Sequence, residues 1–331
     1  MKNSISKINN TSVKIFLIFF IFLIFSLPCL AQDKYLPYIG IVDISSNITP
    51  GGAYSLKRLV NLAQDKGVKI LVFSDSFLRR WEYGLPIFSN IFKISKEERS
   101  VVKYGIKRYL QDFKKIKDEF PDMLILEGIE VAPFYWWSGS LFKKNLTMND
   151  WSRHLLVIGL KKYQDYMHLP VVGNRYFIPQ LKDIPLLFIF ASLIILGIFI
   201  LKKRKPRKFL GITLTILGTL FLLNLFPFSA SRHNPYYGDK GFLPYQDLID
   251  YANKKSGLVF WAHPEITEQA SLGKFLTIDY YTPSYPEVLI FTSGYTGFGV
   301  NMLSGTSHNL ILAAGEWDKV LISYCKGERN Q

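Results

Sequence analysis

The chain has 331 residues, a formal net charge of +14 at pH 7 and a hydrophobic fraction of 49%. Together with a positive mean hydropathy of +0.13, this fraction is high for a wholly soluble protein, so the composition itself indicates membrane segments. Much of the positive charge lies in two clusters, within residues 2–14 and 202–208, and both flank apolar runs. A nucleic-acid surface would spread its charge over one face, so we interpret the clusters as membrane topology signals and expect no nucleic-acid partner.

Residues 1–31 have the features of a secretory signal peptide. Lysines precede an apolar stretch from residue 15 to about residue 25, and Pro28 and Ala31 follow. Cleavage after Ala31 would export the remaining chain, and an uncleaved N-terminal anchor is the alternative. The chain has two cysteines, Cys29 and Cys325. We therefore expect neither a disulfide framework nor a cysteine-rich zinc site.

The first flank, residues 32–183, alternates between strand and helix patterns. Apolar runs predict strands, and amphipathic runs predict helices. The expected strands cover residues 38–44, 68–75, 122–131 and 154–160, and the expected helices cover 53–67 and 97–120. The aromatic stretch 136–151 has no such pattern, and we expect an inserted loop there.

Two apolar runs without charges follow, at residues 185–201 and 209–228. Each is close to the length of about 20 residues that crosses a bilayer as a helix. The short basic loop between them, KKRKPRK at 202–208, predicts a cytoplasmic position. Both outer ends of this hairpin then lie on the side to which the leader exports the chain. We expect a multi-pass protein of the cell membrane whose globular part is extracytoplasmic.

The second flank, residues 229–331, continues the alternation of the first. It predicts helices at 245–257 and 315–325 and strands at 258–263 and 287–294. Because the hairpin returns the chain to the same side, we expect both flanks to form one domain interrupted by the hairpin. Apolar strands that alternate with helices are typical of a parallel α/β sheet or barrel.

Five residues at the strand ends could coordinate a metal: Asp43, Asp75, Glu130, His154 and His263. Chemistry in parallel α/β folds gathers where strands end. Each of these residues could instead have a structural role. An aspartate after a strand often caps the next turn, which is the favoured interpretation for Asp75. Glu130 could form a salt bridge, and a lone histidine is more often structural than a ligand.

The order of these strand ends resembles the PHP family (polymerase and histidinol phosphatase), in particular its membrane-attached bacterial members. The matching stretches are GIVDIS, SLKRLVNLAQDKGVKILVFSDS, LEGIEV, RHLLVIGL and LVFWAHPE. They stand where the family has H-x-H, T-D-H, G-x-E, a histidine before a strand, and a-H-P. The resemblance implies a distorted TIM-type (β/α)7 barrel and hydrolysis of phosphoesters with up to three metal ions.

The chain departs from this family pattern at several ligand positions. Ser45 and Ser76 stand where the family has histidines, and the closing D-x-H motif is not found before Gln331. A hydroxyl binds a divalent ion more weakly than an imidazole does. The resemblance therefore leaves Glu130, His154 and His263, with Asp43 as a substitute ligand. We expect one divalent metal at these four residues, with zinc favoured and manganese or iron as alternatives.

Three functions remain open from the sequence. The first is a membrane-tethered extracytoplasmic phosphoesterase that acts on a phosphorylated small molecule through a reduced metal site. The second is a non-catalytic PHP-like domain that binds a ligand or a partner. The third is a truncated remnant with an incomplete barrel. The substitutions at Ser45 and Ser76 leave open whether the chain is an enzyme.

Overall fold

The computed structural model describes the residues within one compact unit, Ile39–Gln331, except for short gaps. The described ranges are 39–85, 87–174, 184–202, 207–225, 232–264, 267–272, 278–285, 287–299 and 318–328. The expected signal peptide and most of the basic loop lie outside these residues, so both interpretations stay predictions.

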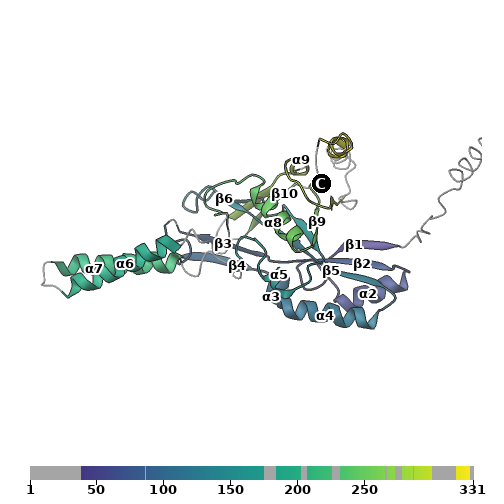
Figure 1. Ribbon diagram of the computed structural model, residues 1–331, viewed down its shortest axis with the longest axis horizontal. Coiled ribbons are helices and arrows are strands. Elements are labelled where there is room, and N and C mark those ends of the chain that lie inside the picture. The colour runs from purple at the N-terminus through teal and green to yellow at the C-terminus, as the bar shows by residue number, and fades with distance from the viewer. Residues whose placement is uncertain are drawn as a thin grey trace, which may run out of the picture. The chain divides into compact units, whose positions relative to one another are not determined.

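A mixed sheet forms the centre of the unit (Figure 1). Its strands are, in spatial order, β1 (Gly40–Ile44), β2 (Ile70–Ser76), β5 (Leu124–Val131), β8 (Leu155–Ile158), β9 (Leu258–Trp261) and β12 (Gly297–Phe298). The mixed α/β class is as predicted. Among the described strands, β1 and β12 are the two edges, so the sheet curls into a half-barrel and does not close into the expected barrel.

One strand of this sheet runs against the others. The pairs β1–β2, β2–β5 and β9–β12 are parallel, whereas β8 is antiparallel to both β5 and β9. The start of β8 therefore meets the C-terminal ends of its two neighbours. Glu130 is paired with Leu156, and Leu156 with Phe260. This register brings His154, directly before β8, to the end of the sheet at which β5 and β9 terminate.

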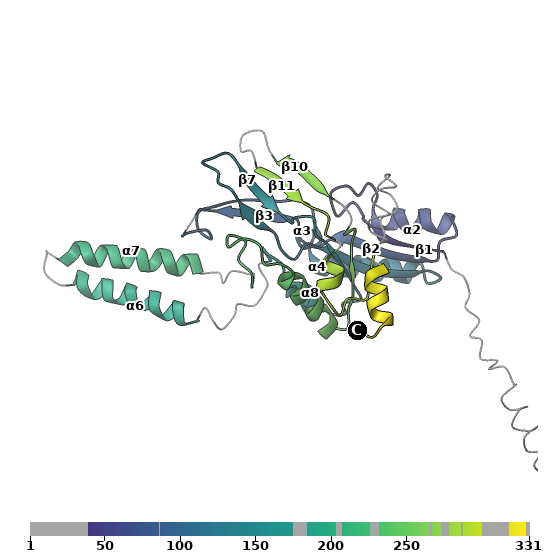
Figure 2. The same cartoon turned by 90° about the horizontal axis from the view of Figure 1, so that it is seen from above.

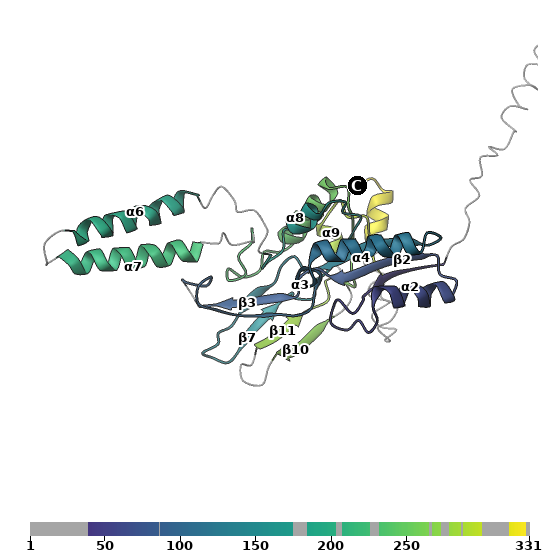
Figure 3. The ribbon, with the colours of Figure 1, turned by 90° about the horizontal axis from the view of Figure 1, so that it is seen from below.

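The two faces of the sheet differ in what covers them. On one face, strand residues such as Phe73, Ile129 and Trp261 join the main hydrophobic core with three helices, α2 (Leu56–Asp65), α4 (Ile106–Glu119) and α8 (Leu243–Lys254). Figure 3 shows α2 and α4 beside the strands. The other face carries a smaller apolar cluster of Val72, Leu156 and Ile158, and Glu130 is paired with Leu156 of this cluster. Because Ile129 faces the main core, Glu130 projects from this second face.

The stretch 136–151 is not an irregular loop. It contributes β6 (Trp136–Ser138) and β7 (Leu146–Asn149) to a second sheet, in which β10 (Glu268–Leu272) and β11 (Ile278–Thr282) complete the order β10-β11-β7-β6. Leu146 and Met148 are buried, whereas Thr147 and Asn149 are only half-buried, which is the period of two expected for a strand with one covered face. A second, aromatic core packs against this sheet.

The expected helix at 97–120 is two helices. It divides into α3 (Val101–Tyr104) and α4 because Gly105 has φ 102°, a conformation that favours glycine and ends the first helix. The expected strand at 287–294 is also wrong. Its residues form the short helix α9 (Val288–Phe291), and the first two of these, Val288 and Leu289, are buried.

The two apolar runs form α6 (Ile184–Leu201) and α7 (Lys208–Leu225), an antiparallel pair (Figure 2). Glycines allow their close approach: a Cβ at Gly197 would lie 2.9 Å from the carbonyl oxygen of Gly211. Hydroxyl groups within the pair are satisfied locally, since Thr215 Oγ1 donates to the carbonyl of Gly211 and Ser192 Oγ to that of Phe188.

Candidate metal centre

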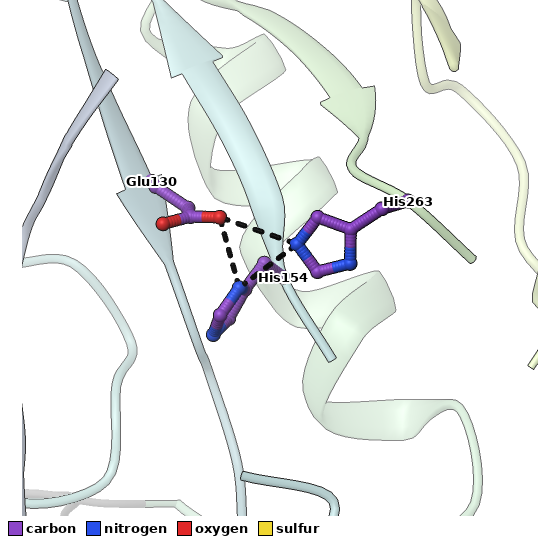
Figure 4. A group of neighbouring side chains, drawn as sticks. All are labelled: Glu130, His154 and His263. Atoms are coloured by element: carbon purple, nitrogen blue, oxygen red, sulfur yellow. Dashed lines mark hydrogen bonds and ion pairs between the residues drawn. The ribbon is translucent and has the colours of Figure 1, made fainter. Parts of the chain in front are cut away.

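Three side chains converge at the end of the sheet where β5 and β9 terminate and β8 begins (Figure 4). His154 Nδ1 lies 2.9 Å from Glu130 Oε1, and His263 Nε2 lies 3.4 Å from the same oxygen. The two ring nitrogens are 3.3 Å apart. The three side chains are only 14–17% exposed, so this cluster is partly withdrawn from water. We call Glu130, His154 and His263 the Glu–His cluster.

The backbone positions each member of the cluster in a different way. Glu130 is part of β5, and its second carboxylate oxygen is 3.5 Å from the hydroxyl of Ser76 on β2. His154 directly precedes β8. His263 follows β9 by two residues and has φ 31°, a left-handed conformation that is rare outside glycine. Such backbone strain persists where the surroundings fix it and is typical of functional sites.

The cluster keeps its carboxylate ionised. Burial raises the pKa of Glu130, but the charges and hydrogen bonds of His154 and His263 outweigh burial and hold that pKa well below its usual range. Burial lowers the pKa of His263, but the hydrogen bond and charge of Glu130 and the charge of Asp43 outweigh burial and raise that pKa above its ordinary value. The cluster thus combines an ionised carboxylate with two imidazoles. A divalent cation binds such a set of groups by displacing the protons of the imidazoles.

The spacing of the three ligand atoms fits one metal ion. They all lie within 4.8 Å of one another. A tetrahedral zinc ion with bonds of about 2.0–2.1 Å would separate its ligand atoms by roughly 3.3 Å. Two of the three separations, 3.3 and 3.4 Å, agree with this value, and the third, 2.9 Å, needs a small opening between Glu130 and His154. The residues therefore support a divalent metal.

The two aspartates of the sequence prediction lie outside the cluster. Asp43 is exposed and has φ 69°, and only its charge influences His263. Asp75 is fully buried, and its carboxylate accepts hydrogen bonds from the backbone N–H of Ser46 (2.8 Å) and from the hydroxyls of Ser46 (2.9 Å) and Thr49 (3.2 Å). Asp75 therefore has a structural role, but it fixes the loop after β1 rather than the turn after its own strand.

Tyr285 supports both histidines and was not found from the sequence. Its hydroxyl is 2.9 Å from the carbonyl oxygen of Ala262 and accepts from the backbone N–H of His154 at 3.3 Å. The N–H of Ala262 donates to the carbonyl of His154 (3.1 Å). One buried hydroxyl thus joins the two backbone segments that present the imidazoles. A tyrosine in a loop between prolines carries no sequence signal for this role.

Tyr285→Phe is expected to lower zinc affinity by about 10-fold, at the low end of the 10–100-fold typical when a supporting group around a metal site is lost. The variant removes only the hydroxyl, so the affinity loss would exceed what the small change in packing explains. Competition with a chromogenic chelator measures the affinity in the purified full chain.

Tyr245→Phe is the matched control for this variant. Tyr245 is also fully buried and its ring packs against Trp261, but its hydroxyl has no hydrogen-bond partner among the described residues. Its removal should leave zinc affinity within about twofold of the unaltered chain. Equal affinities for both variants would contradict the supporting role of Tyr285.

Comparisons with known proteins give little that bears on the reaction. No family model matches the chain, and no curated protein matches it. Among solved structures, the chain is similar to a crystal structure described as a "putative metal-dependent phosphoesterase" from Bifidobacterium adolescentis ATCC 15703. The match has 10% identity and a TM-score of 0.36, and it covers 86% of this chain and 85% of the other.

Proposed function

We propose that this chain is a membrane-tethered, metal-dependent hydrolase of the phosphoester class with a reduced, one-ion site. Glu130 Oε1, His154 Nδ1 and His263 Nε2 converge at the strand ends and are partly withdrawn from water. This convergence supports the metal-dependent chemistry. The series of motifs that resembles the PHP family supports a phosphorylated small molecule as substrate and an incomplete PHP-type barrel as the fold. When bound, a divalent ion supplies Lewis acidity toward a phosphoryl oxygen and toward water.

We propose zinc as the resident ion. Two imidazole nitrogens and one carboxylate oxygen are the ligand set of many catalytic zinc sites, in which the fourth position stays open to water or substrate. The same set also suits iron(II), and manganese is a weaker competitor for imidazole. Asp43 stays the candidate for a fourth ligand, since its charge already acts on His263.

A non-catalytic binding role is the second candidate, and the surroundings of the cluster favour weak activity. Ser76 presents a hydroxyl beside Glu130, and the carboxylate of Asp75 is occupied by Ser46 and Thr49. Within the described residues, the three members of the cluster are the only group with metal-ligand spacing. A phosphoester would then meet one ion, with no second ion to neutralise its oxygens.

Hydrolysis of p-nitrophenyl phosphate and bis(p-nitrophenyl) phosphate by the full chain in detergent distinguishes the two candidates. We expect slow turnover that a chelator removes and zinc restores. Glu130→Gln should abolish the zinc-restored rate, because the amide keeps the shape of the side chain and removes its charge. Binding of zinc without any turnover above that of Glu130→Gln would favour the non-catalytic role.

The exposure of α6 and α7 supports the membrane tether. Both helices are long and apolar enough to cross a bilayer, yet only 6% and 11% of their residues are buried. A core helix of a soluble protein would be mostly buried. Large side chains such as Phe188, Ile195 and Leu223 are instead exposed. A helix that is apolar all around requires an apolar environment, which a lipid bilayer supplies.

Cysteine labelling of intact cells tests the proposed topology. In a background with Cys29→Ser and Cys325→Ser, a membrane-impermeant maleimide should label a cysteine at Phe142, whose side chain is 89% exposed. A cysteine at Lys205, between the two helices, should react only after the cells are permeabilised. Labelling at Lys205 in intact cells would overturn the extracytoplasmic position of the globular part.

A further inference from the structure

The strands β3 (Arg80–Gly84) and β4 (Lys93–Glu97) form a two-stranded hairpin whose turn has no role in the candidate metal centre. We call residues 85 and 87–92 the β3–β4 tip. The tip carries no charged residue, and three of its large apolar side chains are exposed: Leu85 (44%), Ile87 (71%) and Phe92 (50%). Three exposed apolar side chains in one short turn call for an apolar partner.

The tip contacts the end of α7. The backbone N–H of Asn90 donates to Oδ1 of Asn224 (2.9 Å), and Nδ2 of Asn90 donates to the carbonyl of Asn224 (2.7 Å). In return, Nδ2 of Asn224 donates to the carbonyl of Ile87 (3.1 Å). The last turn of a helix leaves carbonyl groups without helical partners, so the tip satisfies one of them. Figures 2 and 3 show β3 directed toward this end of α7.

An aromatic contact continues the connection along the helix. The Phe88 ring lies 5.2 Å from the Phe221 ring, which in turn stacks on the Phe190 ring of α6 at 5.2 Å. Phe221 is four residues before the end of α7, which corresponds to about 6 Å along the helix axis. The tip therefore reaches the level of the last helical turn, beside apolar residues of both helices.

Charges begin directly behind the tip. In the stem, Glu82 pairs with Lys93 across the two strands (2.7 Å) and also with Arg80, and Arg80 pairs with Glu97 (2.8 Å). The element is thus apolar at its end and charged along its stem. This distribution suits a membrane surface, where apolar side chains enter the interface and charged ones stay in the headgroup region or in water.

We propose that the β3–β4 tip inserts into the bilayer interface beside α7 and fixes the globular unit at the membrane surface. The partner that covers the exposed apolar side chains of the tip is therefore lipid. The inference rests on the proposed membrane-spanning role of α6 and α7. It also assigns a role to Asn224, the polar residue near the end of α7, which holds the tip at that depth.

Fluorescence quenching by spin-labelled lipids tests the insertion. The full chain, with both native cysteines replaced by serine, carries one NBD-labelled cysteine and is reconstituted in phosphatidylcholine vesicles with shallow (5-doxyl) or deep (12-doxyl) spin labels. A label at Ile87 should be quenched mainly by the shallow spin label, about threefold or more above a label at Phe142. Phe142 is the matched control because it is an exposed aromatic residue on another loop.

A label at Leu217, in the middle of α7, separates the two possible failures. Quenching at Leu217 by the deep spin label together with quenching at Ile87 no greater than at Phe142 would overturn insertion of the tip while α7 still spans the bilayer. No quenching at Leu217 would overturn the membrane-spanning role and the inference with it. Blue-shifted NBD emission at Ile87 without quenching would show that protein, not lipid, covers the tip, and would also overturn the inference.

Asn224→Leu provides a second test, in which the change lies on α7 and not on the exposed side chains of the tip. The substitution keeps α7 apolar and removes the side-chain hydrogen bonds to Asn90 and Ile87. Quenching at Ile87 should fall by about half or more, while quenching at Leu217 stays unchanged. Unchanged quenching at Ile87 in this variant would contradict the assigned role of Asn224.

Discussion

His263→Ala is expected to reduce the zinc content of the purified full chain from about one ion per chain to near zero. Removal of a supporting group around a metal typically lowers affinity about 10–100-fold, so removal of a ligand should lower it by about 100-fold or more. The remaining pair, Glu130 and His154, would hold the ion with only two side-chain ligands. Elemental analysis after dialysis against a weak chelator measures the loss.

His168→Ala is the control for this experiment. His168 caps the C-terminus of α5 (Tyr163–Met167), is half-buried like His263 and lies outside the Glu–His cluster. Its substitution should leave the zinc content unchanged. Zinc retained by His263→Ala, or lost equally from His168→Ala, would contradict the proposed centre.

Asp75→Ala is expected to destabilise the globular unit strongly without removing the metal. The variant leaves the buried N–H and hydroxyl of Ser46 without their acceptor, whereas the hydroxyl of Thr49 keeps the carbonyl of Ser46 at 3.3 Å. Unsatisfied buried donors cost about 1–3 kcal/mol each, and the loop can recover part of this, so we expect a loss of about 3–5 kcal/mol. In a chain of this size that corresponds to a melting temperature lower by roughly 10 °C.

Asp75→Asn separates the shape of this side chain from its charge. The amide oxygen can still accept from the Ser46 N–H, so the loss of stability should be about half that of Asp75→Ala. Both variants should retain zinc in the folded fraction. A normal melting temperature combined with loss of zinc would show that Asp75 belongs to the metal site and not to the loop after β1.

The sequence predicted the members of the Glu–His cluster but could not show why they meet. An apolar run that stops at a polar residue marks the end of a strand, and this pattern identifies Glu130 and His263. His154 stands at the start of its strand. The apolar run at 155–158 is compatible with either strand direction, so the antiparallel orientation of β8, which brings His154 to the other two, depends on pairing with β5 and β9.

Local patterns were misleading where tertiary contacts decide the structure. The β-branched and aromatic residues of 287–294 favour a strand, yet Val288 and Leu289 are buried in the main core as part of a helical turn. The β3–β4 hairpin gave no strand signal, because its strands are rich in charge. Its stability comes in part from cross-strand ion pairs such as Arg80–Glu97, which become visible only once the strands are paired.

The position of α6 and α7 in the chain has a consequence for how the metal centre assembles during synthesis. Both helices lie between β8 and β9, and the two histidines that meet beside those strands are 109 positions apart. At about 5–20 residues per second, a ribosome needs roughly 5–20 s to travel from His154 to His263. During that interval the nascent chain holds only Glu130 and His154, and the third member is made after both apolar helices. The centre is therefore completed only after both apolar helices have been made, and a chain that stalls or misfolds at α6 or α7 lacks the third member of the cluster.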